Sequence, residues 1–273
     1  MLNLDFSMHF GKYVFLLFIL FACTKSEYVK NILVLGHAGM GLSMDNSIYH
    51  DNSKEAISLA LNLPTSNGVE VDVRLSADGT LWLYHDEWLE AETNGKGCVS
   101  EQSDLQLSEL SYQTLKHEKL VKLMDVLPLL NEDQTLFLDL KQVNSCQNEN
   151  VDFEQLMIAL EDQLAGYKTR VKIICSYKYW LNDLAQQYDS FYSIDDVEEG
   201  KEIILNYPLV KGLVVRNAVI NTQETSWIKN QHKEVYLYDI RSLKGIRQAY
   251  AKNPTGIFAD ELRKALEERG YAL

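Results

Sequence analysis

Two pairs of ionisable side chains have spacings that suit proton transfer and cation binding. Glu70 and Asp72 lie two residues apart within a run of valines, so both carboxylates project from one face of a strand and the valines from the other. His37 and His85 each follow an apolar run, at what would be the end of a strand. Because the unperturbed pKa of histidine is about 6.5, two such side chains can serve as an acid and a base at neutral pH.

A third carboxylate and a lysine repeat the two-residue spacing farther along the chain. Asp139 and Lys141 are separated by one leucine at the end of an apolar run, so they share a face. With Glu70 and Asp72, Asp139 completes an oxygen-rich set of the kind that holds Ca²⁺ or Mg²⁺. This combination fits phosphoryl chemistry, since a cation neutralises the phosphate while one histidine takes a proton and the other gives one. We expect Lys141 to contact the phosphate.

The apolar pattern of the chain predicts the scaffold that brings these side chains together. Strand-like runs alternate with amphipathic stretches, which predicts a parallel sheet of the α/β class, and about eight repeats predict closure into a (β/α)₈ TIM barrel. Nine strand candidates are present where eight are needed, and Phe191–Ile194 has the weakest pattern among them. The candidates are Ile32–Gly36, Val69–Leu75, Thr80–His85, Thr135–Lys141, Val171–Ser176, Phe191–Ile194, Gly212–Val215, Val235–Asp239 and Gly256–Ala259.

The stretches between the strand candidates predict the helices. Asp152 and Thr222 occupy positions that favour N-caps. The long polar segment at about 87–119 breaks the alternation, which predicts a small insertion after the third strand, over one mouth of the barrel. Because active sites form at the carboxyl ends of barrel strands, we expect the side chains described above to meet at that mouth. The helix candidates are Ser53–Leu63, a broken Ser108–Leu130, Asp152–Leu164, Trp180–Tyr188, Val197–Asn206, Thr222–Gln231 and Leu243–Ala251.

Length and composition exclude several classes of protein. Of the 273 residues, 46% are hydrophobic, and there are only 14 Gly and 4 Pro, which excludes a disordered or fibrous chain. The 26 basic and 39 acidic residues give a net charge of −13, which argues against nucleic acid as a partner. No linker divides the chain, so we expect a single domain over residues 31–273; composition leaves the oligomeric state open.

The amino-terminal residues predict export. Tyr13–Ala22 is an apolar run too short to span a bilayer but of the length of a signal-peptide core, so residues 1–22 are interpreted as a signal peptide. The sequence Leu20-Phe21-Ala22-Cys23 resembles a bacterial lipobox, in which the cysteine is acylated and anchors the protein to a membrane. The alternative is an ordinary cleaved signal. Either reading predicts an exported protein, periplasmic or at the cell surface.

The remaining cysteines and histidines receive structural interpretations. Beyond Cys23, the chain has Cys98, Cys146 and Cys175, which permit at most one internal disulfide and show no C-x-x-C spacing for zinc. We expect buried or loosely placed thiols. The other histidines past residue 30 have no acidic partners at ligand spacing, and we assign them to the surface or to structural contacts; they are His50, His117 and His232.

An ordered series of motifs resembles the glycerophosphodiester phosphodiesterase family. The match is close from about residue 34 to 141, and beyond it only the layout of strands persists. The resemblance implies a TIM barrel, catalytic histidines at His37 and His85, and a divalent metal held by Glu70, Asp72 and Asp139. It also implies attack by a substrate hydroxyl on phosphorus, giving a cyclic phosphate that water opens. The motifs are His37-Ala38-Gly39, Asn52-Ser53, Glu70-Val71-Asp72, Ala77-Asp78-Gly79-Thr80, His85-Asp86, Thr93-Asn94-Gly95-Lys96-Gly97, Asp139-Leu140-Lys141, Tyr236-Leu237-Tyr238-Asp239 and Gly256-Ile257-Phe258-Ala259-Asp260.

Several positions depart from the family pattern. Ala38 stands where the family usually has arginine, which matches a subgroup with His-Ala-Gly, and a methyl group cannot replace a bidentate guanidinium on phosphate. Asp51 and Asp139 replace glutamates, and Tyr238 replaces a tryptophan. We therefore expect hydrolysis of a small phosphodiester such as a deacylated phospholipid derivative. Two alternatives stay open, a lipoprotein that binds a phosphorylated glycan or lipid without turnover and a lyase that stops at the cyclic phosphate.

Overall fold

The computed structural model describes residues 29, 31–42, 44, 47–144 and 146–271. The predicted signal peptide at 1–22 and the acylation candidate Cys23 lie outside the described residues, and their assignments stay predictions. In the described ranges, no helix has the length and apolar character needed to cross a membrane.

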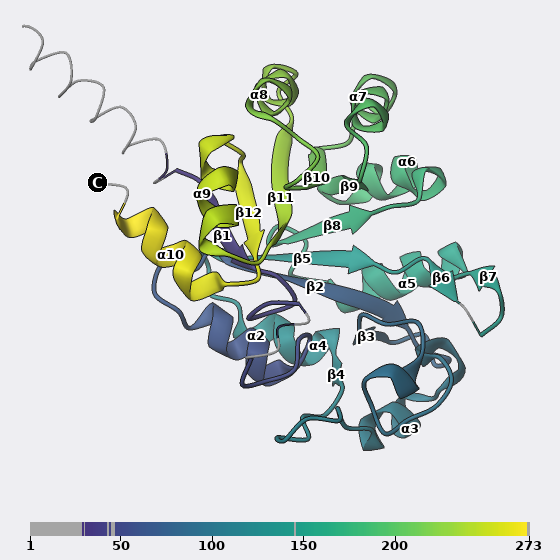
Figure 1. Ribbon diagram of the computed structural model, residues 1–273. Helices are drawn as coiled ribbons and strands as arrows, with labels where there is room; N and C mark the ends of the chain where they lie inside the picture. The colour runs from purple at the N-terminus through teal and green to yellow at the C-terminus, as the bar shows by residue number, and fades with distance from the viewer. Residues whose placement is uncertain (1–28, 30, 43, 45–46, 145, 272–273) are drawn as a thin grey trace, which may run out of the picture.

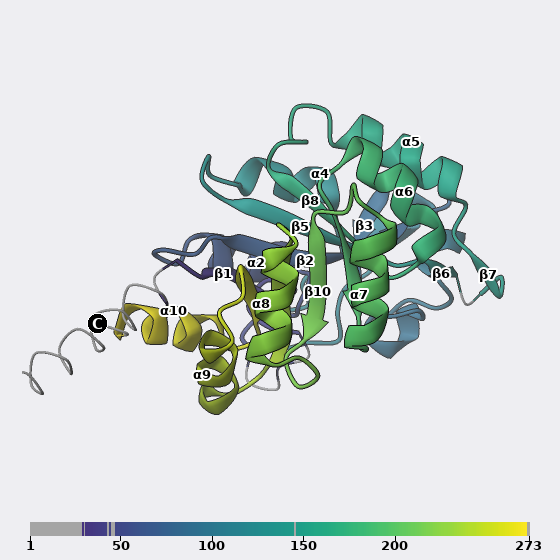
Figure 2. The same ribbon diagram turned by 90° about the horizontal axis from the view of Figure 1, so that it is seen from above.

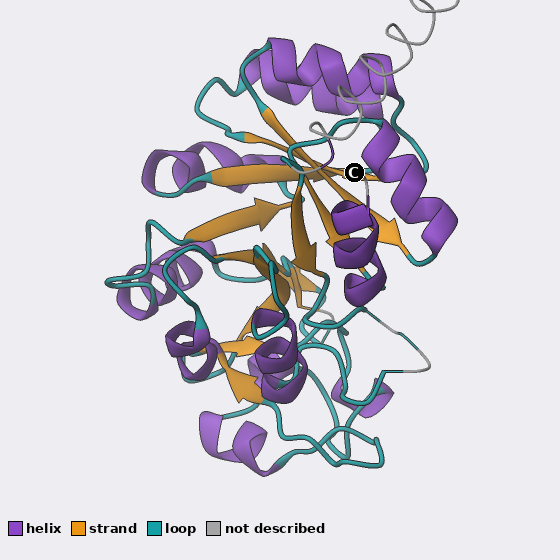
Figure 3. Ribbon diagram, turned by 90° about the vertical axis from the view of Figure 1, so that its left-hand side faces the viewer, coloured by secondary structure: helices purple, strands orange, loops and turns teal. Residues whose placement is uncertain are grey.

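Eight parallel strands in the described part of the chain close into a barrel, which confirms the predicted fold class (Figure 1). Neighbours pair in order around the barrel, and β1 closes it by pairing with both β12 and β2. Figure 3 shows the helices surrounding this central set of strands. The barrel strands are β1 (Leu33–Gly36), β2 (Gly68–Leu75), β5 (Thr135–Leu140), β8 (Val171–Cys175), β9 (Ser190–Ile194), β10 (Gly212–Arg216), β11 (Glu234–Ile240) and β12 (Gly256–Ala259).

The two faces of the barrel strands carry different side chains. The valines of β2 point outward into the large core shared with the helices. Inside the barrel, aromatic rings from β5, β9, β11 and β12 fill the centre, where the ring centroids of Phe137 and Tyr236 lie 4.8 Å apart and those of Phe137 and Phe258 lie 5.0 Å apart. This packed interior leaves polar side chains room only at the ends of the strands.

Helices cover the barrel, and local capping sets where they begin. Ser53 and Asp152 cap α2 and α5, as the side chain of each accepts backbone N–H groups of the first turn. The cap of α8 is Asn221, one residue before the predicted Thr222. Figure 2 shows α7 and α8 lying beside β10. The helices are α2 (Lys54–Leu61), α5 (Phe153–Gln163), α6 (Lys178–Gln187), α7 (Val197–Asn206), α8 (Thr222–Asn230), α9 (Leu243–Ala251) and α10 (Leu262–Tyr271).

The strand prediction was wrong about which of its nine candidates lies outside the barrel. Phe191–Ile194 belongs to β9 and is a barrel strand, whereas Thr80–His85 contains β3 (Leu81–Leu83), which pairs antiparallel with β2. The reason is the short connection, because parallel neighbours need a crossover of about a dozen residues and the link from β2 to β3 is a tight turn. β4 (Val121–Lys122) then pairs antiparallel with β3 and extends the sheet outward.

The chain between β3 and β4 forms a cap with its own small core. It contains η1 (Leu89–Ala91), η2 (Val99–Glu101) and α3 (Asp104–Glu109), followed after β4 by α4 (Leu123–Val126) and η3 (Leu127–Leu129). The predicted helix over Ser108–Leu130 was wrong in its bounds. A capping box at Ser103 starts α3 earlier, and a turn with His117 at a φ of 52° separates α3 from α4.

A disulfide joins this cap to the segment after β5. Cys98, which precedes η2, is bonded to Cys146. Cys146 lies between the strands of a small hairpin, β6 (Val143–Asn144) and β7 (Glu149–Asn150). The expectation of unpaired thiols was therefore wrong for this pair, since 48 residues of sequence separate the two cysteines and nothing local predicts their contact. Cys175 is a buried free thiol, as expected.

Candidate active site

A cavity of about 380 Å³ opens at the carboxyl end of the barrel. A wider surface hollow of about 740 Å³ lies among the segments that precede β2 and β5, at the amino end, where barrels do not place their active sites. The cavity at the carboxyl end is lined by His37, Leu42, Glu70, Asp72, His85, Asp139, Lys141, Ile174, Ser193, Val214, Arg216, Tyr238, Asp239, Arg241 and Phe258. The structure thus brings every site residue predicted from the sequence into one space.

Three carboxylates and one ammonium group form what we call the mouth cluster, consisting of Glu70, Asp72, Asp139 and Lys141. Glu70 and Asp72 are buried on β2, and Asp72 lies opposite Asp139 of β5 in the strand register. The three carboxylates offer oxygens within 4.8 Å of one another. Lys141 Nζ lies 2.6 Å from an oxygen of Asp72 and 2.6 Å from one of Asp139, so it contacts two of the three carboxylates.

Burial and neighbouring charges shift the pKa values of the mouth cluster in opposite directions. Burial, reinforced by the charge of Asp72, raises the pKa of Glu70. Burial would also raise the pKa of Asp72, but Lys141, together with His85 and the hydrogen bond from Asn52, outweighs burial and holds that pKa low. Asn52 supports Asp72 from the other side, because its Nδ2 donates to Asp72 Oδ2 at 2.7 Å and its Oδ1 accepts from the Asp72 N–H at 2.9 Å.

The mouth cluster fits a divalent cation by its donor chemistry. Glu70, Asp72 and Asp139 are oxygen donors, the class that Ca²⁺ and Mg²⁺ prefer. The cluster carries a formal charge of −2 when ionised, since Lys141 offsets only one carboxylate of three. The buried Glu70 carboxylate receives a hydrogen bond from the Ala38 N–H at 3.0 Å, and its raised pKa reflects a buried charge that a cation would stabilise.

His37 follows β1 and is held by an aspartate that follows the neighbouring strand, β12. Its Nδ1 lies 2.8 Å from Asp260 Oδ1, and its Nε2 lies 3.7 Å from Glu70 Oε2. Burial lowers the pKa of His37, but the hydrogen bond to Asp260 and the charges of Glu70 and Asp260 outweigh burial and raise it to about 9. The chain turns directly after β1, and this turn requires glycine at position 36, because a Cβ there would lie 1.8 Å from the carbonyl oxygen of Gly39.

Asp260 ends the last of the family-like motifs in the sequence, but it was not among the predicted site residues. It directly follows β12 as His37 directly follows β1, and the two strands pair with Gly36 opposite Ala259. The position of Asp260 after the last barrel strand, beside the end of the first, was the sequence feature that could have predicted it as a site residue.

His85 reaches the cavity although its strand lies outside the barrel. Its Nδ1 lies 2.7 Å from Asp86 Oδ1, and its carbonyl oxygen accepts a hydrogen bond from Arg74 Nη2 at 2.8 Å. Both histidines therefore present Nδ1 to a carboxylate, which leaves each Nε2 as the position for proton exchange.

Residues of β10 and β11 form a part of the cavity that the sequence interpretation did not predict, and we call it the arginine wall. It consists of Arg216, Tyr238, Asp239 and Arg241. Asp239 Oδ2 lies 2.7 Å from Arg216 Nη1, and its Oδ1 lies 3.1 Å from Arg241 Nε. Arg216 ends β10 and Arg241 follows β11, so position at strand ends was again the only signal in the sequence.

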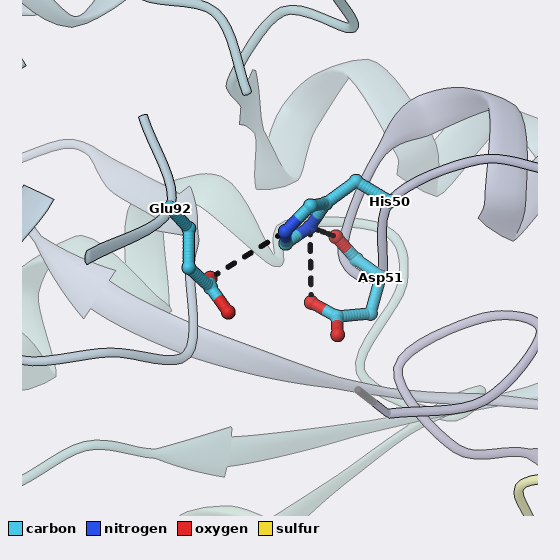
Figure 4. Close-up of side chains that lie close together, drawn as sticks. All are labelled: His50, Asp51 and Glu92. Carbon is cyan, nitrogen blue, oxygen red and sulfur yellow. Dashed lines mark hydrogen bonds and ion pairs between the residues drawn. The ribbon is translucent and has the colours of Figure 1, made fainter. Parts of the chain in front are cut away.

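A second group of potential metal ligands lies where the cap meets the loop before α2, and we call it the interface cluster. It consists of His50, Asp51 and Glu92 (Figure 4). His50 Nδ1 lies 2.8 Å from the carbonyl oxygen of Asp51 and 3.2 Å from its carboxylate, while Nε2 lies 3.7 Å from Glu92. The expectation that His50 has no acidic partners was wrong, because Glu92 comes from the irregular cap, 42 residues along the chain.

The chain matches a known family across its first barrel strands. A sequence model of the glycerophosphoryl diester phosphodiesterase family matches residues 37–194, more than half of the chain. A glycerophosphodiester phosphodiesterase of Bacillus altitudinis is 22% identical over 234 residues, which span 81% of this chain and 93% of its own length. One from Caldanaerobacter subterraneus is 36% identical over 69 residues, 25% of this chain and 26% of its own length.

Solved structures share the fold at low sequence identity. A phosphodiesterase of Oleispira antarctica in complex with the product sn-glycerol-3-phosphate superposes with a TM-score of 0.73 at 19% identity, covering 88% of this chain and 97% of that one. A putative glycerophosphoryl diester phosphodiesterase from Silicibacter pomeroyi has a TM-score of 0.75 at 15% identity, covering 91% and 98%.

Proposed function

Because the chain belongs to the glycerophosphoryl diester phosphodiesterase family, we propose that it hydrolyses a small glycerophosphodiester at the mouth of its barrel. Membership makes the chain a phosphoric diester hydrolase. The observation that carries the proposal is the convergence of His37, His85 and the mouth cluster on one cavity. The sn-glycerol-3-phosphate bound to the Oleispira relative supports a glycerol phosphate unit in the substrate.

The proposed mechanism assigns charge neutralisation to the mouth cluster and proton transfer to the two histidines. Glu70, Asp72 and Asp139 would hold a divalent cation, Ca²⁺ or Mg²⁺, which neutralises phosphate charge when bound. Lys141 adds a fixed positive charge beside Asp72 and Asp139. His37 and His85 exchange protons through Nε2, one removing a proton from the attacking hydroxyl and the other protonating the leaving oxygen.

Local contacts prepare both histidines for these roles. Asp260 and Asp86 accept from Nδ1 of His37 and His85, which fixes the orientation of each ring toward the cavity. Ala38 provides no guanidinium, and its backbone N–H instead donates to Glu70. We place the chain in the family subgroup with His-Ala-Gly on this residue.

The test is turnover of glycerophosphoglycerol, followed by phosphorus NMR, with added Ca²⁺ or Mg²⁺ and with EDTA. We expect glycerol phosphate as the end product, and loss of turnover in EDTA and in His37→Ala and His85→Ala. Full activity in either histidine variant contradicts the proton-transfer roles, and EDTA-resistant turnover contradicts the metal. A cyclic phosphate that accumulates identifies a lyase, and intact diester that stays tightly bound identifies a binding protein.

We also propose that the protein is exported and anchored through an acyl group on Cys23. The support is the apolar run before Cys23 and the lipobox-like sequence around it. Metabolic labelling with an alkyne fatty acid should mark the wild-type chain and leave Cys23→Ser unlabelled. A labelled Cys23→Ser variant contradicts the anchor.

A further inference from the structure

We propose that the arginine wall is a subsite for a second anionic group of the substrate, a carboxylate or a phosphate on its leaving alcohol. This inference rests on the proposed function, because it names the class of phosphodiester that the same cavity accepts. It assigns Arg216 and Arg241 as specificity-determining residues that act away from the scissile phosphate.

The arginine wall lies across the barrel from the mouth cluster. Counting around the closed sheet, β10 is the fourth strand from β2 in either direction, and β11 is the fourth from β5. Arg216 therefore stands across the mouth from Glu70 and Asp72, and Arg241 across from Asp139 and Lys141. A phosphate held beside the mouth cluster leaves the arginine wall facing the other end of the substrate.

A backbone irregularity in β11 turns Asp239 into the cavity. Strict alternation along β11 would point Asp239 outward, because Tyr238 faces inward. The register with β12 shifts between Leu237 and Ile240, and Asp239 has a φ of 60°, a left-handed conformation that few residues other than glycine adopt. The carboxylate then lies between two guanidinium groups and holds both at the mouth.

Both guanidinium groups keep N–H donors for a ligand. A guanidinium has five N–H groups. In the part of the chain that the structure describes, Arg216 contacts Asp239 and Asp195 through Nη1 and Nε. Arg241 uses Nε for both Asp239, at 3.1 Å, and Asp260, at 4.0 Å. The unused N–H groups form the planar fork that binds carboxylate or phosphate in a bidentate manner.

The same contacts disfavour a cationic head group. The Arg216 guanidinium lies over the Tyr238 ring, 5.0 Å from its centroid, and so occupies the aromatic face that a quaternary ammonium would use. The Tyr238 hydroxyl donates to Asp195 at 2.8 Å, so this carboxylate is already engaged by two donors. The wall therefore offers positive donors, and a guanidinium already covers one face of its aromatic ring.

The experiment compares diesters that differ only in the leaving alcohol. The alcohols are glycerol, which is uncharged, choline, which is cationic, glyceric acid, which adds a carboxylate, and glycerol 3-phosphate, which adds a phosphate. We expect kcat/KM for the two acidic diesters to exceed that for the glycerol diester by about tenfold to a hundredfold, the effect of one or two charged hydrogen bonds. Whichever acidic diester gives the larger ratio identifies the anion.

Variants of the arginines test the assignment. Arg216→Gln and Arg241→Gln should bring the ratio between acidic and uncharged diesters toward one, and Arg216→Lys should give an intermediate ratio. Arg247→Gln is the matched control, because Arg247 forms an exposed ion pair with Glu268 and does not line the cavity, and it should keep the full ratio. An equal fall of kcat/KM for all diesters, with the ratio retained, overturns the subsite and assigns the arginines to the scissile phosphate.

Binding measured by calorimetry in EDTA separates this inference from the proposed function. The wild-type protein should bind the acidic diesters more tightly than the uncharged one, and Arg241→Gln, whose side chain is half exposed, should remove the difference. Tight, arginine-dependent binding in EDTA, with no hydrolysis of any diester once Ca²⁺ or Mg²⁺ is added back, keeps the subsite and rejects the enzyme. Hydrolysis with no preference for acidic diesters keeps the enzyme and rejects the subsite.

Discussion

The mouth cluster and the interface cluster hold similar sets of metal-binding side chains in different surroundings. Each brings three potential ligands within 4.8 Å of one another. The carboxylates of the mouth cluster come from two barrel strands and line the cavity, and two of them contact Lys141. The residues of the interface cluster come from the loop before α2 and from the cap, and His50 lies between its two acids.

Because the two clusters differ in their surroundings, the types of the ligands alone do not define a metal site. In the interface cluster, His50 can balance one carboxylate by keeping its proton, because the carboxylates of Asp51 and Glu92 raise its pKa to about 9 despite the opposing effect of burial. Its ring also stacks on Tyr112 of the cap, with centroids 3.7 Å apart. We interpret the interface cluster as an ion-pair contact that fixes the cap, and the mouth cluster as the catalytic cation site.

The largest expected effect is on kcat/KM, which a substitution in the mouth cluster should lower far more than the same substitution in the interface cluster. Glu70→Gln should lower kcat/KM about a thousandfold, because it removes a charge that the transition state depends on. Glu92→Gln is the matched change in the interface cluster, and we expect it to lower kcat/KM less than about fivefold. Hydrolysis rates of glycerophosphoglycerol measure both, and comparable losses in the two variants contradict the distinction.

The second prediction uses thermal stability and needs no turnover. A cation at about one hundred times its Kd stabilises the folded state by about 2.7 kcal/mol, or roughly 5–10 °C in Tm for a chain of this size. We expect this rise in the wild-type protein and in Glu92→Gln, and none in Glu70→Gln. A rise that survives Glu70→Gln and disappears in Glu92→Gln places the cation in the interface cluster.

The third prediction concerns pH and stability at the interface cluster. Because the pKa of His50 rises from about 6.5 in the unfolded chain to about 9 in the folded one, its contribution is fully present below pH 6.5 and is lost as pH rises toward 9. His50→Asn should remove about 1–3 kcal/mol of unfolding free energy at pH 6 and much less at pH 9.5. Urea unfolding across this range measures the difference.

The control for that prediction is a histidine that belongs to the cap itself. His117 is exposed and adopts a φ of 52°, which asparagine tolerates. We expect His117→Asn to leave the dependence of stability on pH close to that of the wild-type protein. An unchanged profile in His50→Asn shows that His50 does not hold its proton through the two acids.

The smallest effect is expected from the ring that supports His50. Tyr112→Phe keeps the stacked ring and removes one hydroxyl, which lies 3.5 Å from the Leu83 carbonyl oxygen. A hydrogen bond this long contributes little, so we expect a loss below about 1 kcal/mol and no change in the pH profile. Urea unfolding checks this, and a loss of several kcal/mol shows that the hydroxyl organises the cap.

The sequence allowed the barrel and the core of the site to be predicted because both follow local rules. Alternation along β2 places Glu70 and Asp72 inside the barrel, and the parallel arrangement brings His37 and Asp139 to the same mouth. The fold class was confirmed by the closed sheet and by the solved relatives. The assigned roles of these residues stay predictions.

The residues that escaped prediction depend on contacts between distant segments. Cys98 and Cys146 meet only because the cap folds back on the segment after β5. Asp260 meets His37 only when β12 closes the barrel against β1. Asp239 faces the cavity through a shift in register, which no alternation rule predicts.

The short strand β4 has a consequence for how the molecule behaves in solution. Closure of a barrel leaves no strand with unpaired backbone groups, but β3 and β4 extend the sheet from β2 and so give it one open edge. That edge is two residues long, Val121–Lys122, and Lys122 is paired with Asp104 of the cap at 2.6 Å. Shortness and charge are the features that keep exposed edges from pairing with another chain, so the extension that carries His85 to the mouth offers little template for aggregation.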